Sequence, residues 1–247
     1  MTLTEAVAAL RALGRPQRLI ENARVAIPND GALGITIPAL RTLARTVGWD
    51  HDLALQLWET GIHEARLLAA FIDDPARVTE SQLERWVSDF DSWDICDGVC
   101  GLFERTPLAW AKAVEWSARE EEFVRRAAFT LVAGFAVHDK DAPDMRFLAF
   151  LPIIRERSTD DRNFVKKAVN WALRNIGKRN RALNSAAIEM AEQIRADDSR
   201  AGRWIAADAL RELRGEAVQA RLQVRESAAG AGGIHARAKS PASARAT

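Results

Sequence analysis

Hydrophobic residues recur three and four positions apart along most of the chain. This spacing places them on one face of an α-helix, whereas the strict alternation of a half-buried strand is missing. Glycine, proline and polar capping residues separate the periodic segments. The predicted helices cover residues 2–14, 37–48, 50–61, 62–75, 79–90, 106–116, 120–138, 142–157, 160–180, 183–197, 199–213 and 216–224, with another that begins near Trp93.

Capping signals mark several of these helix starts. Asp50 and Thr106 precede periodic segments, and Thr79 and Gln82 have capping-box spacing. Helices of this length joined by short links predict an all-α fold, a curved solenoid of stacked antiparallel helical hairpins. No repeated letter pattern is visible, so this prediction depends on segment lengths. We expect one domain over residues 1–225 and a disordered tail, rich in Ala, Gly, Ser and Arg, over 226–247.

The composition is that of a soluble globular protein, with 48% hydrophobic and 28% charged residues among 247. No run approaches the ~18 apolar residues of a membrane span. The amphipathic N-terminus lacks the basic start and unbroken apolar centre of a signal peptide. We therefore expect a cytoplasmic protein that does not interact with a membrane.

The net charge of +1 conceals a gradient along the chain. Residues 1–123 contain 12 basic and 20 acidic side chains, a balance of −8, and residues 124–247 contain the other 23 and 14, a balance of +9. This polarity predicts that the second half faces a polyanion while the first half is a solvated scaffold. Chance segregation of charge is the alternative, so the gradient alone decides nothing.

The stretch DSWDICDGVC at 91–100 concentrates three aspartates and both cysteines. Cys96 and Cys100 lie four apart on one predicted helix, where a disulfide would be strained. The four histidines show no paired spacing for zinc, and HEARL at His63 lacks the second histidine of a zincin motif. We expect neither a metal nor a cofactor.

Three predicted helices carry a chemically active side chain away from the apolar stripe. At about 100° per residue, Trp93 and Asp97 lie side by side on the face opposite Val99. Arg126 points away from its own stripe among small residues, and Trp171 lies at the edge of a polar face. Stacked hairpins place equivalent faces along one concave surface, so these side chains would converge there.

Basic residues near that surface are candidate phosphate contacts. Among them, Arg125 lies nearer its core stripe and could instead form a structural pair. Packing between repeats is the alternative explanation for Trp93 and Trp171, and the other six tryptophans resemble core or edge positions. The candidate DNA-binding residues are Arg125, Lys166, Lys167, Asn170, Arg174, Lys178, Arg179 and Arg181.

A carboxylate in a cationic groove repels phosphates, and that cost indicates a catalytic purpose. Cleavage of the N-glycosidic bond of an alkylated purine fits, because the base already carries positive charge and departs without a general acid. Asp97 would stabilise the positive charge that develops on the deoxyribose and position a water. Indole faces would add cation–π and sugar-stacking contacts.

Several blocks of the chain resemble the AlkD-like DNA alkylation repair enzymes, which are built from HEAT-like helical repeats. The blocks are WVSDFDSWDICD, RRAAF and NFVKKAVNWALRNIGKRN, with GITIPALRTLAR and HEARLLA in the first half, and the resemblance covers most of residues 5–225. It implies a monofunctional glycosylase that acts as a monomer on duplex DNA carrying cationic N3- or N7-alkylated purines. By this resemblance the catalytic set is Asp97, Trp93, Trp171 and Arg126, with Arg125 as the alternative arginine.

Two other functions remain open from the sequence. A non-catalytic DNA-binding module that recognises distorted or branched DNA would keep the basic face and make Asp97 dispensable. A protein-interaction scaffold, a frequent use of helical solenoids, would show no salt-sensitive DNA binding.

Overall fold

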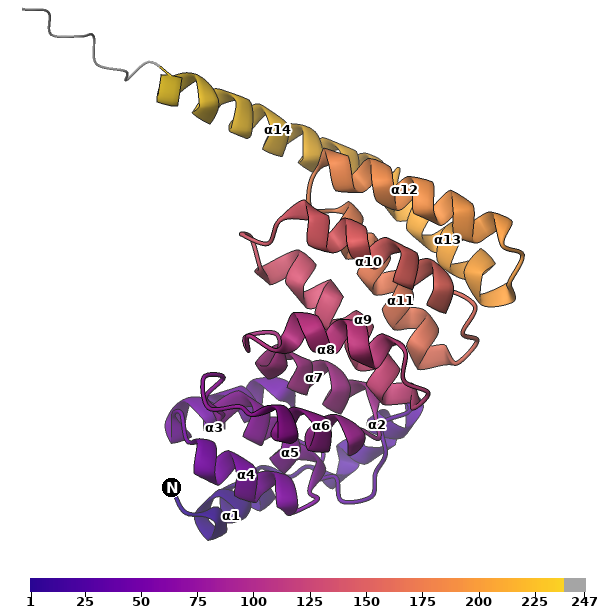
Figure 1. Ribbon diagram of the computed structural model, residues 1–247. Helices are drawn as coiled ribbons and strands as arrows, with labels where there is room; N and C mark the ends of the chain where they lie inside the picture. The colour runs from indigo at the N-terminus through magenta and orange to yellow at the C-terminus, as the bar shows by residue number, and fades with distance from the viewer. Residues whose placement is uncertain (238–247) are drawn as a thin grey trace, which may run out of the picture.

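The computed structural model describes residues 1–237, and within that range every regular element is helical (Figure 1). The first half contains α1 (Leu3–Leu13), a 3-10 turn η1 (Pro16–Arg18), α2 (Leu19–Arg24), α3 (Ile37–Val47), α4 (His51–Glu59), α5 (His63–Ile72), α6 (Glu80–Ser88) and α7 (Trp93–Phe103). The second half contains α8 (Ala109–Ser117), α9 (Glu122–His138), α10 (Asp144–Arg157), α11 (Asn163–Gly177), α12 (Arg181–Ala196), α13 (Arg200–Leu213) and α14 (Glu216–Arg237).

The helix boundaries follow capping chemistry. The Asp50 side chain accepts from the amide of Leu53 at 3.0 Å, as predicted for an N-cap. Thr79 accepts from the Gln82 amide at 3.2 Å, but the Gln82 side chain binds Asp73, so the capping box is only half formed. α8 starts later than predicted, because the Thr106 hydroxyl donates to the preceding helix and leaves Leu108 as the N-cap.

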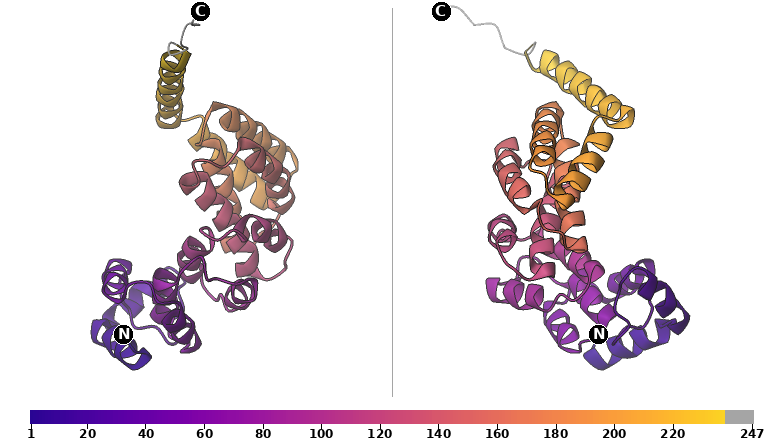
Figure 2. Two further views of the ribbon diagram at one scale, coloured as in Figure 1. Left: turned by 60° about the vertical axis from the view of Figure 1, so that its left-hand side comes forward. Right: turned by 90° about the vertical axis from the view of Figure 1, so that its right-hand side faces the viewer.

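Two layers of helices build the solenoid. Helices α3, α5, α7, α9, α11 and α13 pack one against the next as an inner layer, and α4, α8, α10 and α12 pack behind them. Figure 2 shows that the stack follows an arc, with the N-terminal helices turned toward one side. The predicted curved all-α solenoid is therefore confirmed. Among the described residues, no helix has the length and apolar character needed to cross a membrane.

A buried aromatic cluster joins the layers near the middle of the first half. Trp58 and Trp86 stack with ring centroids 4.1 Å apart, and Phe103 and Trp116 extend the cluster from neighbouring helices. The three tryptophans are almost fully buried. Their predicted packing role is confirmed, and such rings contribute both area burial and about 1 kcal/mol per well-oriented pair.

The C-terminal helix differs from the expected tail. The sequence predicted disorder from residue 226, whereas α14 continues as a helix to Arg237 and projects beyond the stack (Figures 1 and 2). Val218 and Leu222 anchor its first turns by burial. The remainder of the predicted tail, residues 238–247, lies outside the described residues.

Candidate functional site

A groove of about 1500 Å³ opens on the inner layer of the solenoid. One wall comes from the α2–α3 region, the floor from α5 and α7, and the other wall from α9. Two residues of α11, Trp171 and Asn175, complete it. Because the inner helices all present one face to this groove, side chains from distant parts of the sequence meet there.

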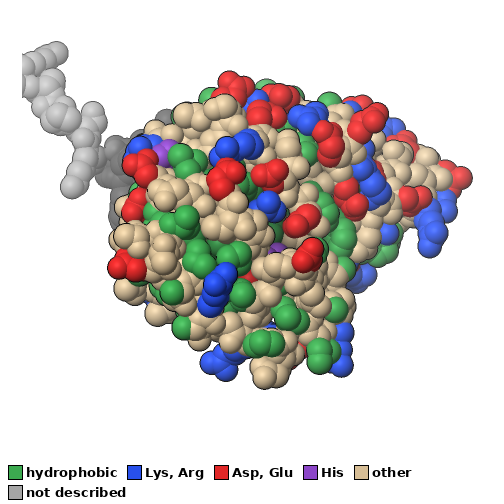
Figure 3. Space-filling model, turned by 90° about the horizontal axis from the view of Figure 1, so that it is seen from below, with side chains coloured by type: hydrophobic (Ala, Val, Ile, Leu, Met, Phe, Trp, Pro, Cys, Tyr) green, Lys and Arg blue, Asp and Glu red, His purple; other side chains and the backbone are tan. Residues whose placement is uncertain are grey.

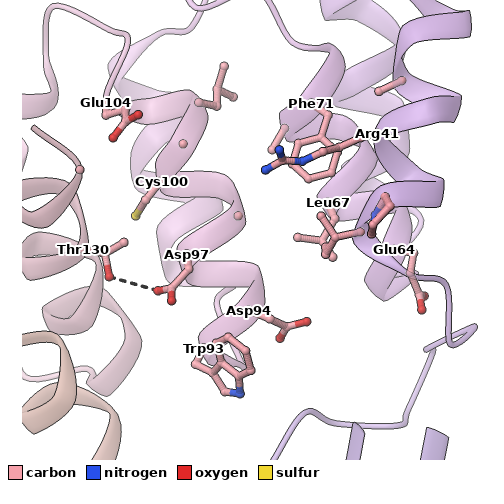
Figure 4. A pocket seen from close by; sticks show the side chains of 18 of the residues that line it. Arg41, Glu64, Leu67, Phe71, Trp93, Asp94, Asp97, Cys100, Glu104 and Thr130 are labelled. Atoms are coloured by element: carbon pink, nitrogen blue, oxygen red, sulfur yellow. Dashed lines mark hydrogen bonds between the residues drawn. The ribbon is translucent and has the colours of Figure 1, made fainter. Parts of the chain in front are cut away.

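Three side-chain hydrogen bonds hold the carboxylate of Asp97 in the groove. Arg126 donates from Nε to Oδ1 at 3.0 Å and from Nη2 to Oδ2 at 2.7 Å. The Thr130 hydroxyl donates to Oδ1 at 3.2 Å, as Figure 4 shows. Arg126 also donates to the Phe164 carbonyl at 2.8 Å, which ties α7, α9 and α11 together through one guanidinium. The sequence predicted that Arg126 points away from the core stripe of its own helix. In the structure its guanidinium pairs with the carboxylate of Asp97.

Burial sets the ionisation of this pair. Desolvation raises the pKa of Asp97 above its ordinary value, although Arg126 and Thr130 both favour the charged form. Burial disfavours the charge of Arg126, yet Asp97 outweighs it and the guanidinium pKa is raised. Asp97 is therefore a carboxylate that takes up a proton at a higher pH than an exposed aspartate does.

The two predicted site tryptophans line the same groove as Asp97. Trp93 is partly exposed in the groove, and its Nε1 donates to the carbonyl of Val25 at 2.9 Å. This bond fixes the indole against the segment that follows α2. Trp171 reaches the groove from α11 and is also partly exposed. Both indoles thus line the groove rather than the core.

Small residues let the inner helices approach closely around Asp97. A Cβ on Gly98 would lie 2.6 Å from a methyl carbon of Leu67 on α5. A Cβ on Gly134 of α9 would collide with the carboxylate of Glu104. Gly98 therefore lets α7 lie close to Leu67 of α5, and Gly134 leaves room for the Glu104 carboxylate.

A second carboxylate, Asp94, faces the groove one helical turn before Asp97. Asp94 lies about 100° round the helix from Trp93, so helical periodicity did not place it in the site. Its Oδ2 lies 2.7 Å from Nε2 of His63 on α5, and Figure 4 shows it directed toward that side. Burial lowers the pKa of His63, but the hydrogen bond and charge of Asp94 outweigh burial and raise it. The i,i+3 spacing of Asp94 and Asp97 was the available signal.

The far end of the groove contains further groups that the sequence reasoning missed. Glu104 lies 2.7 Å from Nδ1 of His138, and burial raises the pKa of this carboxyl against the effect of that imidazole. Trp49 is 64% exposed on the rim, so its predicted packing role is wrong. Trp204, also predicted to pack, is 42% exposed. Nothing in the local pattern distinguishes these indoles from core tryptophans.

Arginines of the first half also line the groove. Arg41 and Arg45 project from α3 as exposed side chains four residues apart, and Arg105 follows α7. Arg41 lies over the Phe71 ring (Figure 4), and within residues 1–237 none of the three forms an ion pair. Cations of the first half therefore line the groove, which the charge gradient of the sequence did not predict.

Most of the predicted DNA-binding residues of α11 face the next inner helix instead. Asn170 is buried and donates to Asp208 at 2.7 Å. Arg174 and Lys178 both pair with Glu212 on α13. The helical wheel identified their polar face correctly, but that face packs against α13 through ion pairs rather than opening on the groove.

The basic run at 178–181 and Arg125 have structural partners too. Arg125 pairs with Asp160 at 2.7 Å, which agrees with the role of structural pair-former considered for it. Arg179 donates to backbone carbonyls of the last turn of α9 and of the link that follows it, and Arg181 pairs with Glu226 on α14. Arg125 and Arg181 are thus paired with carboxylates, and Arg179 is held by carbonyl oxygens.

The two lysines of α11 differ from these residues. Lys167 is exposed and forms no ion pair in the described part of the chain. Lys166 lies over the ring of Trp204, 5.3 Å from its centroid. Of the predicted set, these two remain available to a ligand on the α11–α13 surface.

Charges on the N-terminal end of the molecule, the lower end in Figure 1, are mixed. Seen from below, acidic and basic side chains are interspersed among apolar ones (Figure 3).

Cys96 and Cys100 are buried free thiols that contact carbonyls of α9, and burial raises the pKa of Cys100. In residues 1–237, no three His, Cys, Asp or Glu side chains form a cluster that could hold a metal ion.

Comparison with known proteins agrees with the helical-repeat fold. A solved structure described as "A new family of proteins related to the HEAT-like repeat DNA glycosylases with affinity for branched DNA structures" aligns with a TM-score of 0.74 at 20% identity, over 90% of this chain and 96% of its own. A designed armadillo repeat protein in complex with a (KR)4 peptide aligns over 90% of this chain and 97% of its own, with a TM-score of 0.35 at 15% identity. No curated protein matches the chain. The family model described as "DNA alkylation repair enzyme" matches residues 6–223, and the chain therefore belongs to the DNA alkylation repair enzyme family.

Proposed function

We propose that the chain is a DNA glycosylase that hydrolyses the N-glycosidic bond of cationic N3- and N7-alkylated purines in duplex DNA. The observation that carries this proposal is the carboxylate of Asp97, fixed by Arg126 and Thr130 in a groove that two tryptophans also line. A fixed negative charge beside aromatic faces suits a reaction in which positive charge moves from the base to the sugar.

The hydrogen bonds of Asp97 leave it free to act on a sugar. An ionised carboxylate offers about four acceptor positions, and three of them are taken by Arg126 and Thr130. One position remains for a water molecule. The bidentate arginine fixes the plane of the carboxylate, so its charge is oriented before the substrate arrives.

The proposed reaction divides between the base and the sugar. The alkylated purine leaves with the electron pair of the glycosidic bond and becomes neutral, so no proton need be supplied to it. The deoxyribose is left as an oxocarbenium-like cation that Asp97 stabilises. Water adds to the anomeric carbon and gives up a proton, with the carboxylate as its nearest acceptor.

The shape of the groove favours recognition of intact duplex from its surface. It is open and about 1500 Å³ in volume, and its floor is formed by packed helices rather than by a deep hole. The arginines of α3 lie on the wall opposite Asp97, as Arg41 does in Figure 4. We infer that the phosphate backbone is bound along this wall while the damaged nucleotide faces Asp97.

The test is the release of base from an oligonucleotide that contains N7-methylguanine, without added metal. We expect free N7-methylguanine and alkali-labile sites with the wild type. Asp97→Asn should lower the rate by roughly 10²–10³-fold while DNA binding is retained or improved. Asp91→Asn is the matched control, because Asp91 precedes the same helix and is exposed outside the groove. Release by Asp97→Asn at the wild-type rate would refute the mechanism.

A second candidate function is binding of branched or distorted DNA without catalysis. The ion pair between Asp97 and Arg126 favours this function, because a carboxylate neutralised by an arginine can have a purely structural role. The similar solved structure belongs to proteins described as having affinity for branched DNA. This function predicts equal affinity for alkylated and plain duplex, tighter binding of a four-way junction, and no released base. Absence of salt-sensitive binding to any DNA would instead favour a protein-interaction scaffold.

A further inference from the structure

Trp49 is an exposed indole on the rim of a polar groove. It follows Gly48, whose positive φ of 78° ends α3 and turns the chain toward α4. The side chain is 64% exposed although it lines the groove. A single exposed apolar side chain is common on protein surfaces, so the groups around this indole decide what it can bind.

A cation covers one face of this indole. The guanidinium of Arg105 lies 5.6 Å from the ring centroid of Trp49. Its Nε donates to the Gly101 carbonyl at 3.2 Å, which holds the arginine to the end of α7. With Arg105 over one face and 64% of the side chain exposed, Trp49 keeps aromatic surface available to a ligand at the groove rim.

The Trp49–Arg105 pair is separate from the reaction centre. Arg105 comes eight residues after Asp97, which corresponds to about 12 Å along the axis of α7. Arg45 of α3 lines the same end of the groove, and it forms no ion pair within residues 1–237. An aromatic face can stack on a nucleobase while a neighbouring unpaired guanidinium contacts the phosphate of the same nucleotide.

We propose that Trp49 and Arg105 form a stacking site for an unpaired nucleobase in DNA, with Arg45 beside the attached phosphate. The proposal builds on the DNA-binding function of the groove. Bases inside a paired duplex already stack on one another, so an indole on the rim can stack only on a base that has lost its pair. The site therefore selects duplexes that contain an unpaired nucleotide, independently of alkylation.

Trp204 provides a matched control within the same chain. It too is exposed, at 42%, and it also carries a cation, Lys166, 5.3 Å from its ring centroid. It lies on α13 and does not line the groove. Trp204→Ala therefore removes an equivalent exposed indole without touching the proposed site.

The test measures binding of three unalkylated, fluorescein-labelled duplexes by anisotropy. One is fully paired, one has a single extra thymidine in one strand, and one has an abasic residue in place of that thymidine. The abasic probe retains the distorted backbone and lacks the base. We expect the wild type to prefer the thymidine bulge over both other probes by roughly 5- to 100-fold, the range of one base–aromatic stack.

Trp49→Ala should abolish this preference and leave affinity for the paired duplex within about twofold, while Trp49→Phe should keep part of it. Trp204→Ala should behave as the wild type. Equal binding of the thymidine and abasic bulges by the wild type, or a preference that persists in Trp49→Ala, would overturn the stacking site alone. Failure of the wild type to bind any of the three duplexes would overturn the DNA-binding function as well.

Discussion

The two halves of the chain carry opposite net charge and use their cations differently. Among the described residues, the first half, at −8, supplies the arginines that line the groove, and these are Arg18, Arg41, Arg45 and Arg105. It also supplies the acids of the lining, whereas the second half, at +9, contributes small and polar residues, one histidine and one tryptophan. The charge gradient of the sequence therefore does not predict which cations line the groove.

The difference lies in which charges already have partners. On α11, Arg174 and Lys178 are balanced by Glu212, and Arg125 is balanced by Asp160. Arg41 and Arg45 have no such partner among the described residues, so their charge extends into the groove. Net charge counts side chains, whereas attraction of a polyanion depends on unpaired ones.

Arg126 belongs to the basic half but pairs with a groove carboxylate, so its removal should have the largest effect. Arg126→Ala leaves Asp97 without its main partner. We expect the free energy of unfolding to fall by about 3 kcal/mol, the lower end for buried pairs, because the Asp97 side chain is a quarter exposed. Urea denaturation measures this, and release of N7-methylguanine should fall in parallel. Arg203→Ala, which breaks an exposed pair, should change stability by less than about 1 kcal/mol.

Removal of the two arginines that α3 contributes to the groove wall should have the next largest effect, and it should act on DNA affinity. Arg41→Ala combined with Arg45→Ala should lower affinity for paired duplex by roughly tenfold or more at low salt. The slope of log affinity against log salt should fall by about 2, one unit for each lost phosphate contact. Thermal stability should hardly change, since neither side chain is buried. An unchanged salt slope would place the phosphate backbone on the other wall.

The matched double variant on α11 should lower stability and leave DNA affinity almost unchanged. Arg174→Ala with Lys178→Ala removes both partners of Glu212, and we expect a loss of about 1–2 kcal/mol in unfolding free energy, since all three side chains are about a quarter exposed. DNA affinity should stay within about twofold. Glu212→Gln should reproduce the loss of stability. If the double variant instead loses DNA affinity and keeps its stability, the cations of the second half contact the DNA, as the charge gradient of the sequence predicts.

The sequence predicted the fold and the inner faces of single helices but not the contacts between helices. Helical periodicity placed Trp93, Asp97 and Arg126 away from their own core stripes, because that pattern is local. Whether a polar face opens on the groove or meets another helix depends on long-range packing, as Asn170 and Arg174 show. Trp49 was missed because it lies in the turn after Gly48, where helical periodicity assigns no face.

The first half also differs in its sensitivity to pH, because histidines neutralise several of its acids. Asp73, Asp94 and Glu104 pair with His51, His63 and His138, whereas acids of the second half pair with arginine or lysine. Only the charge of a histidine partner changes near neutral pH.

The pair of His63 and Asp94 gives the smallest and most specific prediction. The pKa of His63 is raised in the folded state above its unfolded value near 6.5, so its pairing stabilises the protein fully below that pH. The contribution is lost as the pH rises through the raised pKa, and the melting temperature should decline over that interval. His63→Gln keeps a hydrogen-bond donor without a titrating charge and should flatten the decline, and Asp94→Asn should do the same by removing the anion. DNA affinity should follow the same direction, since a protonated His63 offsets the negative charge of Asp94 in the groove. A melting temperature that declines equally in His63→Gln would assign the pH dependence to another group.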